Sequence, residues 1–148
     1  MYPIMVDLTK RNVLIVGGGT IATRKAKGII SAGGMPVIIA PEISDELQKI
    51  VNQYDLQYEK RSFQLGDTTG YDLIFICTNQ PKVNQKILDE VKSNQWVNDT
   101  TKHEHSDFYN MSTIREDRYL VATSTYGKNP SLSKRLRRFI KKNLINFD

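Results

Sequence analysis

The sequence has little cysteine and no long apolar run. Its single cysteine, Cys77, excludes an internal disulfide and any metal site built from several cysteines. No apolar stretch approaches the roughly 20 residues that a membrane-spanning helix needs. The N-terminus lacks a basic segment followed by an apolar one, so we expect a cytoplasmic protein that does not associate with a membrane.

Several catalytic motifs are also absent. The chain has no Gly-x-Ser-x-Gly, no Walker lysine motif and no His-Glu-x-x-His. The two histidines stand together in His103-Glu104-His105. Because this spacing does not suit ligands on a helix, a solvated loop is the favoured interpretation and no metal site is predicted.

Acidic residues are missing from one segment near the C-terminus. Residues 134–142 hold six basic residues and no acid, within a 148-residue chain of net charge +5. Such a segment attracts a polyanion, either nucleic acid or an acidic small molecule. Since no nucleic-acid-binding fold or interleaved aromatic pattern accompanies it, nucleic-acid binding is not expected.

The most informative stretch is a glycine-rich turn between a predicted strand and a predicted helix. Val13–Val16 are apolar and run directly into Gly17-Gly18-Gly19, and a helix-compatible segment follows. In a dinucleotide-binding unit Gly17 allows the sharp turn, Gly19 admits the pyrophosphate to the backbone, and Ala22 lets the helix pack on the strand. A tight turn without a nucleotide is the alternative. On the other sides of the helix, Arg24, Lys25 and Lys27 are expected to form a solvated face.

Strand and helix patterns alternate through the first two thirds of the chain. Predicted strands cover 13–16, 37–40, 56–61, 72–77 and 96–98, with helices at 20–31 and 45–54 and from Pro81. This pattern predicts an α/β fold: a Rossmann-like parallel sheet with helices on both faces. Ligands bind beyond the carboxyl ends of such strands, so Thr78 and Asn79 should face the cofactor.

Two acidic residues follow predicted strands and are candidates for the site. Glu42 follows the second strand, where an acid binds the ribose hydroxyls of NAD and would repel the 2′-phosphate of NADP. It could equally begin the next helix. Asp99 follows the fifth strand, where an enzyme would place an acid, although loop residues often cap a turn there. Both readings remain open for each residue.

The pattern changes after the fifth strand. Segments 108–114 and 119–125 predict a β-hairpin, and Asn129-Pro130 begins a basic amphipathic helix. We therefore expect a nucleotide-binding domain over 1–105 and a hairpin-plus-helix region over 106–148. Ser124, Thr125 and Asn129 either bind a carboxylate or phosphate or merely connect the hairpin to the helix.

The chain resembles the precorrin-2 dehydrogenase/ferrochelatase modules of siroheme synthesis. The resemblance begins with Tyr2-Pro3-Ile4-Met5-Val6-Asp7-Leu8 and the triple glycine followed by Ala22-Thr23-Arg24-Lys25. It continues through Ala40-Pro41-Glu42, Cys77-Thr78-Asn79, Val97-Asn98, Asp107-Phe108 and Ser124-Thr125. It therefore covers essentially the whole chain in order.

The resemblance implies NAD-dependent oxidation of precorrin-2 to sirohydrochlorin, followed in some members by insertion of ferrous iron. It also implies a homodimer formed through the hairpin and the helical region after it. With the motif reading it gives a cofactor set of Gly17, Gly19, Thr20, Ile21, Ala22, Pro41, Glu42, Thr78 and Asn79. The expected tetrapyrrole-binding residues are Ser124, Thr125, Asn129, Arg135 and Arg138. The basic helix suits a substrate rich in carboxylates.

Three departures from the family bear on these expectations. Members commonly carry a catalytic Asp three residues after the strand-five Asn, where this chain has Thr101, which leaves Asp99 as the candidate acid. The Ser before the helix proline is Asn129, another good helix cap. Members usually continue for a further helical segment, so this sequence is either a shortened piece or a module that lacks part of the substrate cover. An NAD-binding sensor without catalysis is the alternative function.

Overall fold

The computed structural model describes residues 1–144 and divides into two compact units, Met1–Phe108 and Tyr109–Asp148. The expected second region thus ends with residues 145–148, which lie outside the described part of the chain. The first unit continues past residue 105 because Phe108 packs in it, with its ring centroid 5.4 Å from that of Phe75. Each unit is described separately below.

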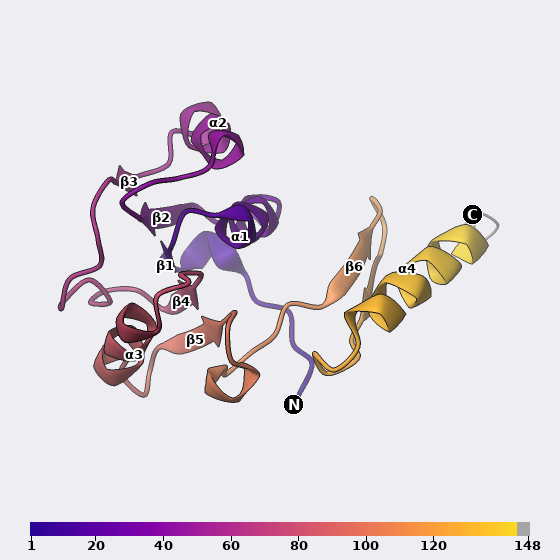
Figure 1. Ribbon diagram of the computed structural model, residues 1–148. Helices are drawn as coiled ribbons and strands as arrows, with labels where there is room; N and C mark the ends of the chain where they lie inside the picture. Colours follow the sequence, from indigo (N-terminus) through magenta and orange to yellow (C-terminus); the bar gives the residue numbers. More distant parts are fainter. Residues whose placement is uncertain (145–148) are drawn as a thin grey trace. The chain divides into compact units, whose positions relative to one another are not determined.

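The first unit is built on a parallel five-stranded sheet in the order β3-β2-β1-β4-β5 (Figure 1). The strands are β1 (Val13–Val16), β2 (Pro36–Ile39), β3 (Tyr58–Glu59), β4 (Leu73–Ile76) and β5 (Trp96–Asp99). The helical segments are η1 (Leu8–Lys10), α1 (Thr20–Ile30), α2 (Asp45–Tyr54), α3 (Pro81–Glu90) and η2 (His103–His105). β3 is shorter than expected and pairs with β2 only at Tyr58 and Glu59.

Helices cover both faces of this sheet, as expected. On one face Val13, Ile15 and Phe75 pack with α1 and α2. On the other, Leu14 and Ile74 pack with Ile87 of α3. Because both faces are covered, β1 and β4 are buried at every residue and read as continuous apolar runs.

The helix starts follow from local sequence. Ser44 caps α2 by accepting a hydrogen bond from the Leu47 backbone amide, 3.2 Å away. Pro81 begins α3, where its fixed φ is compatible with the first turn. Ser44 and Pro81 thus fix the residues at which α2 and α3 begin. The lengths of the loops that follow β2 and β4 are set in this way.

The second unit contains an antiparallel hairpin and one helix. β6 (Ser112–Arg115) pairs with β7 (Leu120–Thr123), and α4 runs over Pro130–Leu144. Both strands are shorter than the sequence suggested. Asn129 caps α4 as expected, because its Oδ1 accepts a hydrogen bond from the Leu132 amide at 2.9 Å.

Candidate functional site

The three glycines after β1 form a turn that only glycine can occupy at two positions. Gly17 has φ +122°, and a Cβ there would lie 2.4 Å from the Cys77 carbonyl oxygen. A Cβ on Gly18 would lie 2.0 Å from the Glu42 carbonyl oxygen. The segments that follow the carboxyl ends of β1, β2 and β4 therefore meet at this turn, which leaves no room for a side chain at Gly17 or Gly18.

Gly19 differs from its neighbours because the protein leaves open space around it. A Cβ on Gly19 would meet nothing within 4 Å, and its φ of −84° is open to any L-residue. Neither packing nor backbone strain therefore explains the glycine. Open space at this N-cap fits the predicted cradle for a bound pyrophosphate, which a side chain here would obstruct.

The first turn of α1 presents backbone amides at this cradle. Gly19 is the N-cap and makes no side-chain capping hydrogen bond. Thr20 and Ile21 are exposed, whereas Ala22 is fully buried and lets the helix lie close to the sheet. Uncapped amides and the positive end of the helix dipole can hold an anion here.

The loop after β2 closes the other side of the cradle. Pro41 and Glu42 are exposed, and Ser44 donates its backbone amide to the Gly18 carbonyl at 2.9 Å. Glu42 also influences Tyr58, whose pKa is raised by burial and then by the charge of Glu42. The Glu42 carboxylate thus lies toward the β2–β3 side, where Rossmann-like folds bind the adenosine ribose.

The carboxyl end of β4 carries a polar turn. Thr78 donates its hydroxyl to Asn84 Oδ1 at 2.6 Å, and Asn84 Nδ2 donates to the Thr78 carbonyl at 3.2 Å. These bonds hold Thr78 beside the glycine turn, while Asn79 is exposed. The nine expected cofactor residues therefore lie at the same edge of the sheet, either on its loops or in the first turn of α1. Their contacts with the cofactor remain a prediction.

Asp99 ends β5 at this same edge, but its carboxylate is enclosed. Its side chain is 1% exposed. Oδ1 accepts hydrogen bonds from the Thr101 amide at 2.8 Å and the Thr101 hydroxyl at 2.7 Å, and Oδ2 lies 3.1 Å from His105 Nδ1. Burial raises the pKa of Asp99, but the bonds from Thr101 and His105 outweigh it and hold the pKa below its ordinary value. Asp99 is thus an ionised carboxylate that organises its loop.

Lys25 does not lie on the solvated face that the sequence suggested. Its Nζ donates to Asn98 Oδ1 at 2.6 Å and sits 5.2 Å above the centre of the Phe75 ring. Burial lowers the pKa of Lys25 to about 8. The solvated face was wrong for Lys25 because its side chain lies against Phe75 of β4 and Asn98 of β5. Arg24 and Lys27 are exposed, as expected.

Cys77 lies close to Lys25 and has the character of an unreactive thiol. Burial raises the pKa of Cys77 to about 11, although the neighbouring Lys25 opposes the shift. A thiol with this pKa is protonated at neutral pH and is a poor nucleophile. Cys77 therefore contributes packing rather than chemistry at this edge.

The five expected substrate residues all belong to the second unit. Thr125 bridges the turn into α4, with its hydroxyl 2.8 Å from Ser133 Oγ and donating to the Asn129 carbonyl at 2.9 Å. Ser124 accepts from the Tyr126 amide at 3.0 Å. These hydrogen bonds stabilise the connection between the hairpin and α4. Arg135 and Arg138 are exposed on α4, so tetrapyrrole binding by this set stays a prediction.

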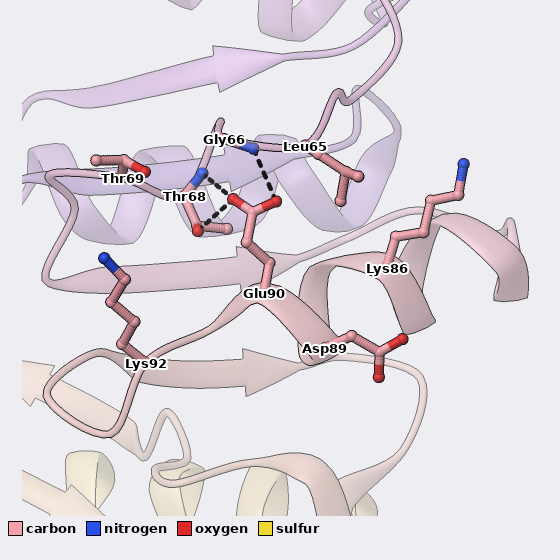
Figure 2. Close-up of a pocket in the computed structure, with 8 residues that line it drawn as sticks. All are labelled: Leu65, Gly66, Thr68, Thr69, Lys86, Asp89, Glu90 and Lys92. Atoms are coloured by element: carbon pink, nitrogen blue, oxygen red, sulfur yellow. Dashed lines mark hydrogen bonds between the residues drawn. The ribbon is translucent and has the colours of Figure 1, made fainter.

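A hollow of the first unit, shown in Figure 2, is lined by none of the expected cofactor residues. It measures about 480 Å³ and is formed by the loop before β4 and the end of α3. Glu90 accepts hydrogen bonds from the Gly66 and Thr68 amides at 2.8 and 3.0 Å, so its carboxylate is used in holding the loop. Because α3 begins at the carboxyl edge and runs back along the sheet, its end marks the opposite edge.

Residues 1–144 contain neither a cluster of metal ligands nor a membrane-spanning helix. Within them, no three His, Cys, Asp or Glu side chains gather where they could hold a metal ion. Nor does this part of the chain contain a helix with the length and apolar character needed to span a bilayer.

Sequence reasoning missed two contacts at the carboxyl edge. The sequence predicts a solvated loop for His105, which instead lies against Asp99. It predicts a solvated face for Lys25, which instead binds Asn98. A spacing of six residues between an acid and a histidine has no meaning in a helix or strand, so no periodic signal could reveal the first contact. The Lys25 contact joins residues 73 positions apart in sequence.

Comparison with known proteins agrees with this geometry. A family model described as "Putative NAD(P)-binding" matches residues 4–112. The precorrin-2 dehydrogenase of Priestia megaterium is 32% identical over 143 residues, which cover 97% of this chain and 71% of that protein. The precorrin-2 dehydrogenase of Bacillus subtilis is 29% identical over 148 residues, or 100% of this chain and 91% of that protein.

A solved structure has the same fold. The structure titled "SirC, precorrin-2 dehydrogenase" superposes with a TM-score of 0.84 at 31% sequence identity, covering 97% of this chain and 70% of that one. The similarity thus extends over the sheet, the glycine turn and the C-terminal hairpin and helix. It confirms both the expected fold and the expected family. The chain belongs to the precorrin-2 dehydrogenase family of NAD(P)-binding proteins.

Proposed function

We propose that this chain oxidises precorrin-2 to sirohydrochlorin with NAD as the hydride acceptor. The observation that carries the proposal is the open cradle at Gly19, bordered by uncapped amides of α1 within a chain of this family. Bound NAD supplies the two-electron acceptor of the reaction. The chain's own residues then bind the cofactor, orient it and exclude water.

The loop after β2 supports NAD rather than NADP. Glu42 is the charged residue between Pro41 and Ser44, and its carboxylate is exposed where the adenosine ribose would lie. A carboxylate accepts hydrogen bonds from ribose hydroxyls and repels a 2′-phosphate. Glu42→Arg should therefore weaken NAD binding and improve NADP binding.

Two elements of the second unit support a polyanionic substrate and a homodimer. α4 combines a run of basic residues with an apolar face on which Leu132, Leu136 and Phe139 are 38%, 37% and 68% exposed. Within the described residues α4 buries no side chain fully. A second copy of the chain would cover this apolar face, since a unit this small cannot build a core alone. The cytoplasmic location and the lack of nucleic-acid binding remain predictions from the sequence.

The direct test is absorbance at the NADH band after the protein is mixed with NAD and precorrin-2 without iron. A rise matched by the sirohydrochlorin spectrum supports the proposal. NAD binding without turnover would instead favour the sensor. Adding ferrous iron to the product then tests ferrochelatase activity, in which iron is a substrate.

A variant of Gly19 tests the cofactor site separately. Gly19→Asp places a carboxylate at the N-cap of α1, where Asp is a favoured residue and no atom of the protein obstructs it. The variant should fold normally and lose NAD binding, because its carboxylate occupies the pyrophosphate position. Gly28→Asp adds the same charge in the same helix, where the Cβ also meets open space, and should retain NAD affinity. Equal affinity in both variants would refute the cofactor assignment.

A further inference from the structure

The loop after β5 holds a histidine against a buried carboxylate. His105 Nδ1 lies 3.1 Å from Asp99 Oδ2, and the His105 side chain keeps 30% of its surface exposed. An ionised carboxylate accepts a hydrogen bond and cannot donate one. It therefore selects the neutral imidazole tautomer with hydrogen on Nδ1, which leaves a lone pair on Nε2.

This loop is fixed along its whole length. Ser106 Oγ accepts from the Asp99 amide at 2.9 Å, and Asp107 Oδ2 accepts from the Val97 amide at 2.7 Å. Thr101 binds the second oxygen of Asp99. The η2 turn that carries His105 is thus tied to β5 on both sides, and the ring is held in one orientation.

The position of the loop in the sheet suits chemistry at the nicotinamide. Asp99 pairs with Ile76 in the β4–β5 register, and the Thr100 amide donates to the Ile76 carbonyl at 3.1 Å. β4 and β5 lie on the far side of β1 from the ribose loop after β2. A dinucleotide that crosses the carboxyl edge from β2 therefore brings its nicotinamide half over the ends of β4 and β5.

Loss of hydrogen from the substrate needs a proton acceptor as well as a hydride acceptor. One C–H bond of precorrin-2 breaks and its electron pair leaves with the hydrogen to NAD. A second bond to hydrogen breaks, its electron pair enters the new double bond of the macrocycle, and the proton leaves. The enzyme must take up this proton and pass it to water.

We propose that His105 Nε2 accepts this proton and that Asp99 is the positioning residue that orients the ring and stabilises its protonated form. The inference rests on the proposed dehydrogenase function. Asp99 is the charged group in contact with the ring. Lys102, His103, Glu104 and Asp107 share its loop, and Cys77 lies near Asp99 from β4. Thr101 donates its amide and hydroxyl to Asp99 and so supports the pair.

The test compares two neighbouring histidines. With precorrin-2 and saturating NAD, His105→Gln should lower kcat for NADH formation about 100-fold, which is the scale of lost general-base catalysis. NAD affinity should be unchanged. His103→Gln, a matched change on the same turn, should stay within about twofold of wild type. Added imidazole should restore part of the activity of His105→Ala, because it can accept the proton from the vacated space.

The pH profile separates proton transfer from a structural effect. A step that needs a base predicts an acidic limb in the wild-type kcat profile, and His105→Gln should lose this limb. Asp99→Asn should lower kcat and leave NAD affinity unchanged, because an amide can donate to Nδ1 as well as accept from it and so no longer selects the tautomer. A His105→Gln enzyme with the wild-type rate would overturn the inference. So would one with a lower rate, an unchanged acidic limb and no rescue by imidazole. An inactive wild type would instead overturn the proposed function.

Discussion

The buried ammonium of Lys25 leads to a quantitative prediction about stability and pH. Its Nζ binds Asn98 and lies above the Phe75 ring, and burial lowers its pKa from 10.5 to about 8. The folded protein therefore releases this proton more readily than the unfolded chain does. Removing the ammonium with Lys25→Met keeps a side chain of similar length and abolishes the titration.

The sign follows from the protons bound in each state. Between pH 8 and 10.5 the unfolded chain holds more protons at Lys25 than the folded protein, so the free energy of unfolding rises with pH. At pH 7 both states are protonated, and burial of the charge destabilises the fold by roughly 3 kcal/mol, from 1.36 kcal/mol per pKa unit. This penalty fades as the pH rises through the window.

The measurement is urea unfolding of wild type and Lys25→Met at pH 7 and pH 10. Relative to the variant, wild type should gain roughly 2 kcal/mol between these pH values. Cys77, whose pKa is raised to about 11, destabilises the fold as the pH rises above 9, but it is present in both proteins and largely cancels. Lys27→Met is the control, because the Lys27 side chain is 55% exposed. A difference between wild type and Lys25→Met that stays constant with pH would refute the burial of a charged Lys25.

Three further substitutions test other parts of the chain. Gly17→Ala should destabilise the fold by about 2 kcal/mol or more, seen as a lower Tm, because its positive φ and the Cys77 carbonyl leave no room for a Cβ. Ser44→Ala should cost about 1 kcal/mol in urea unfolding, since the α2 cap is lost. Replacing the three arginines of α4 with glutamine should raise KM for precorrin-2 and leave NAD affinity unchanged. Unchanged KM would remove α4 from the substrate site.

The parts of the fold that the sequence predicted are those carried by contiguous patterns. Apolar β1 and β4, the glycine turn and the capped helices each lie within one short segment, so periodicity and turn chemistry identify them. The short extent of β3 was missed. Tyr58 and Glu59 make its sheet pairings with β2 alone, and an edge strand with one neighbour carries a weak pattern.

The cofactor-binding part of the candidate site also lies within short sequence segments and could be predicted. The proposed proton-transfer residues come together only through the fold. Gly19 is recognisable because the turn, the helix start and the open space occur within one motif. The Lys25–Asn98 contact and the Asp99–His105 pair depend on how α1 and the η2 turn return to the sheet. The segments that bring α1 and the η2 turn against the sheet have no repeating sequence pattern. These contacts can therefore be recognised only in the structure.

The same distinction bears on Thr101, which stands where the resemblance to the family led us to expect a catalytic acid. Cofactor binding depends on backbone amides and on glycines, so few other residue types are tolerated at those positions. Proton transfer needs only a group of suitable basicity near the substrate, and several arrangements on one loop can supply it. Here Thr101 donates its amide and hydroxyl to Asp99 Oδ1, which leaves Oδ2 facing His105. In our proposal the change at this position therefore moves the proton acceptor along the loop to a residue that Asp99 orients. Thr101→Asp should weaken the pair and so lower kcat for NADH formation, because a second carboxylate beside Asp99 would repel it and could donate no hydroxyl hydrogen bond.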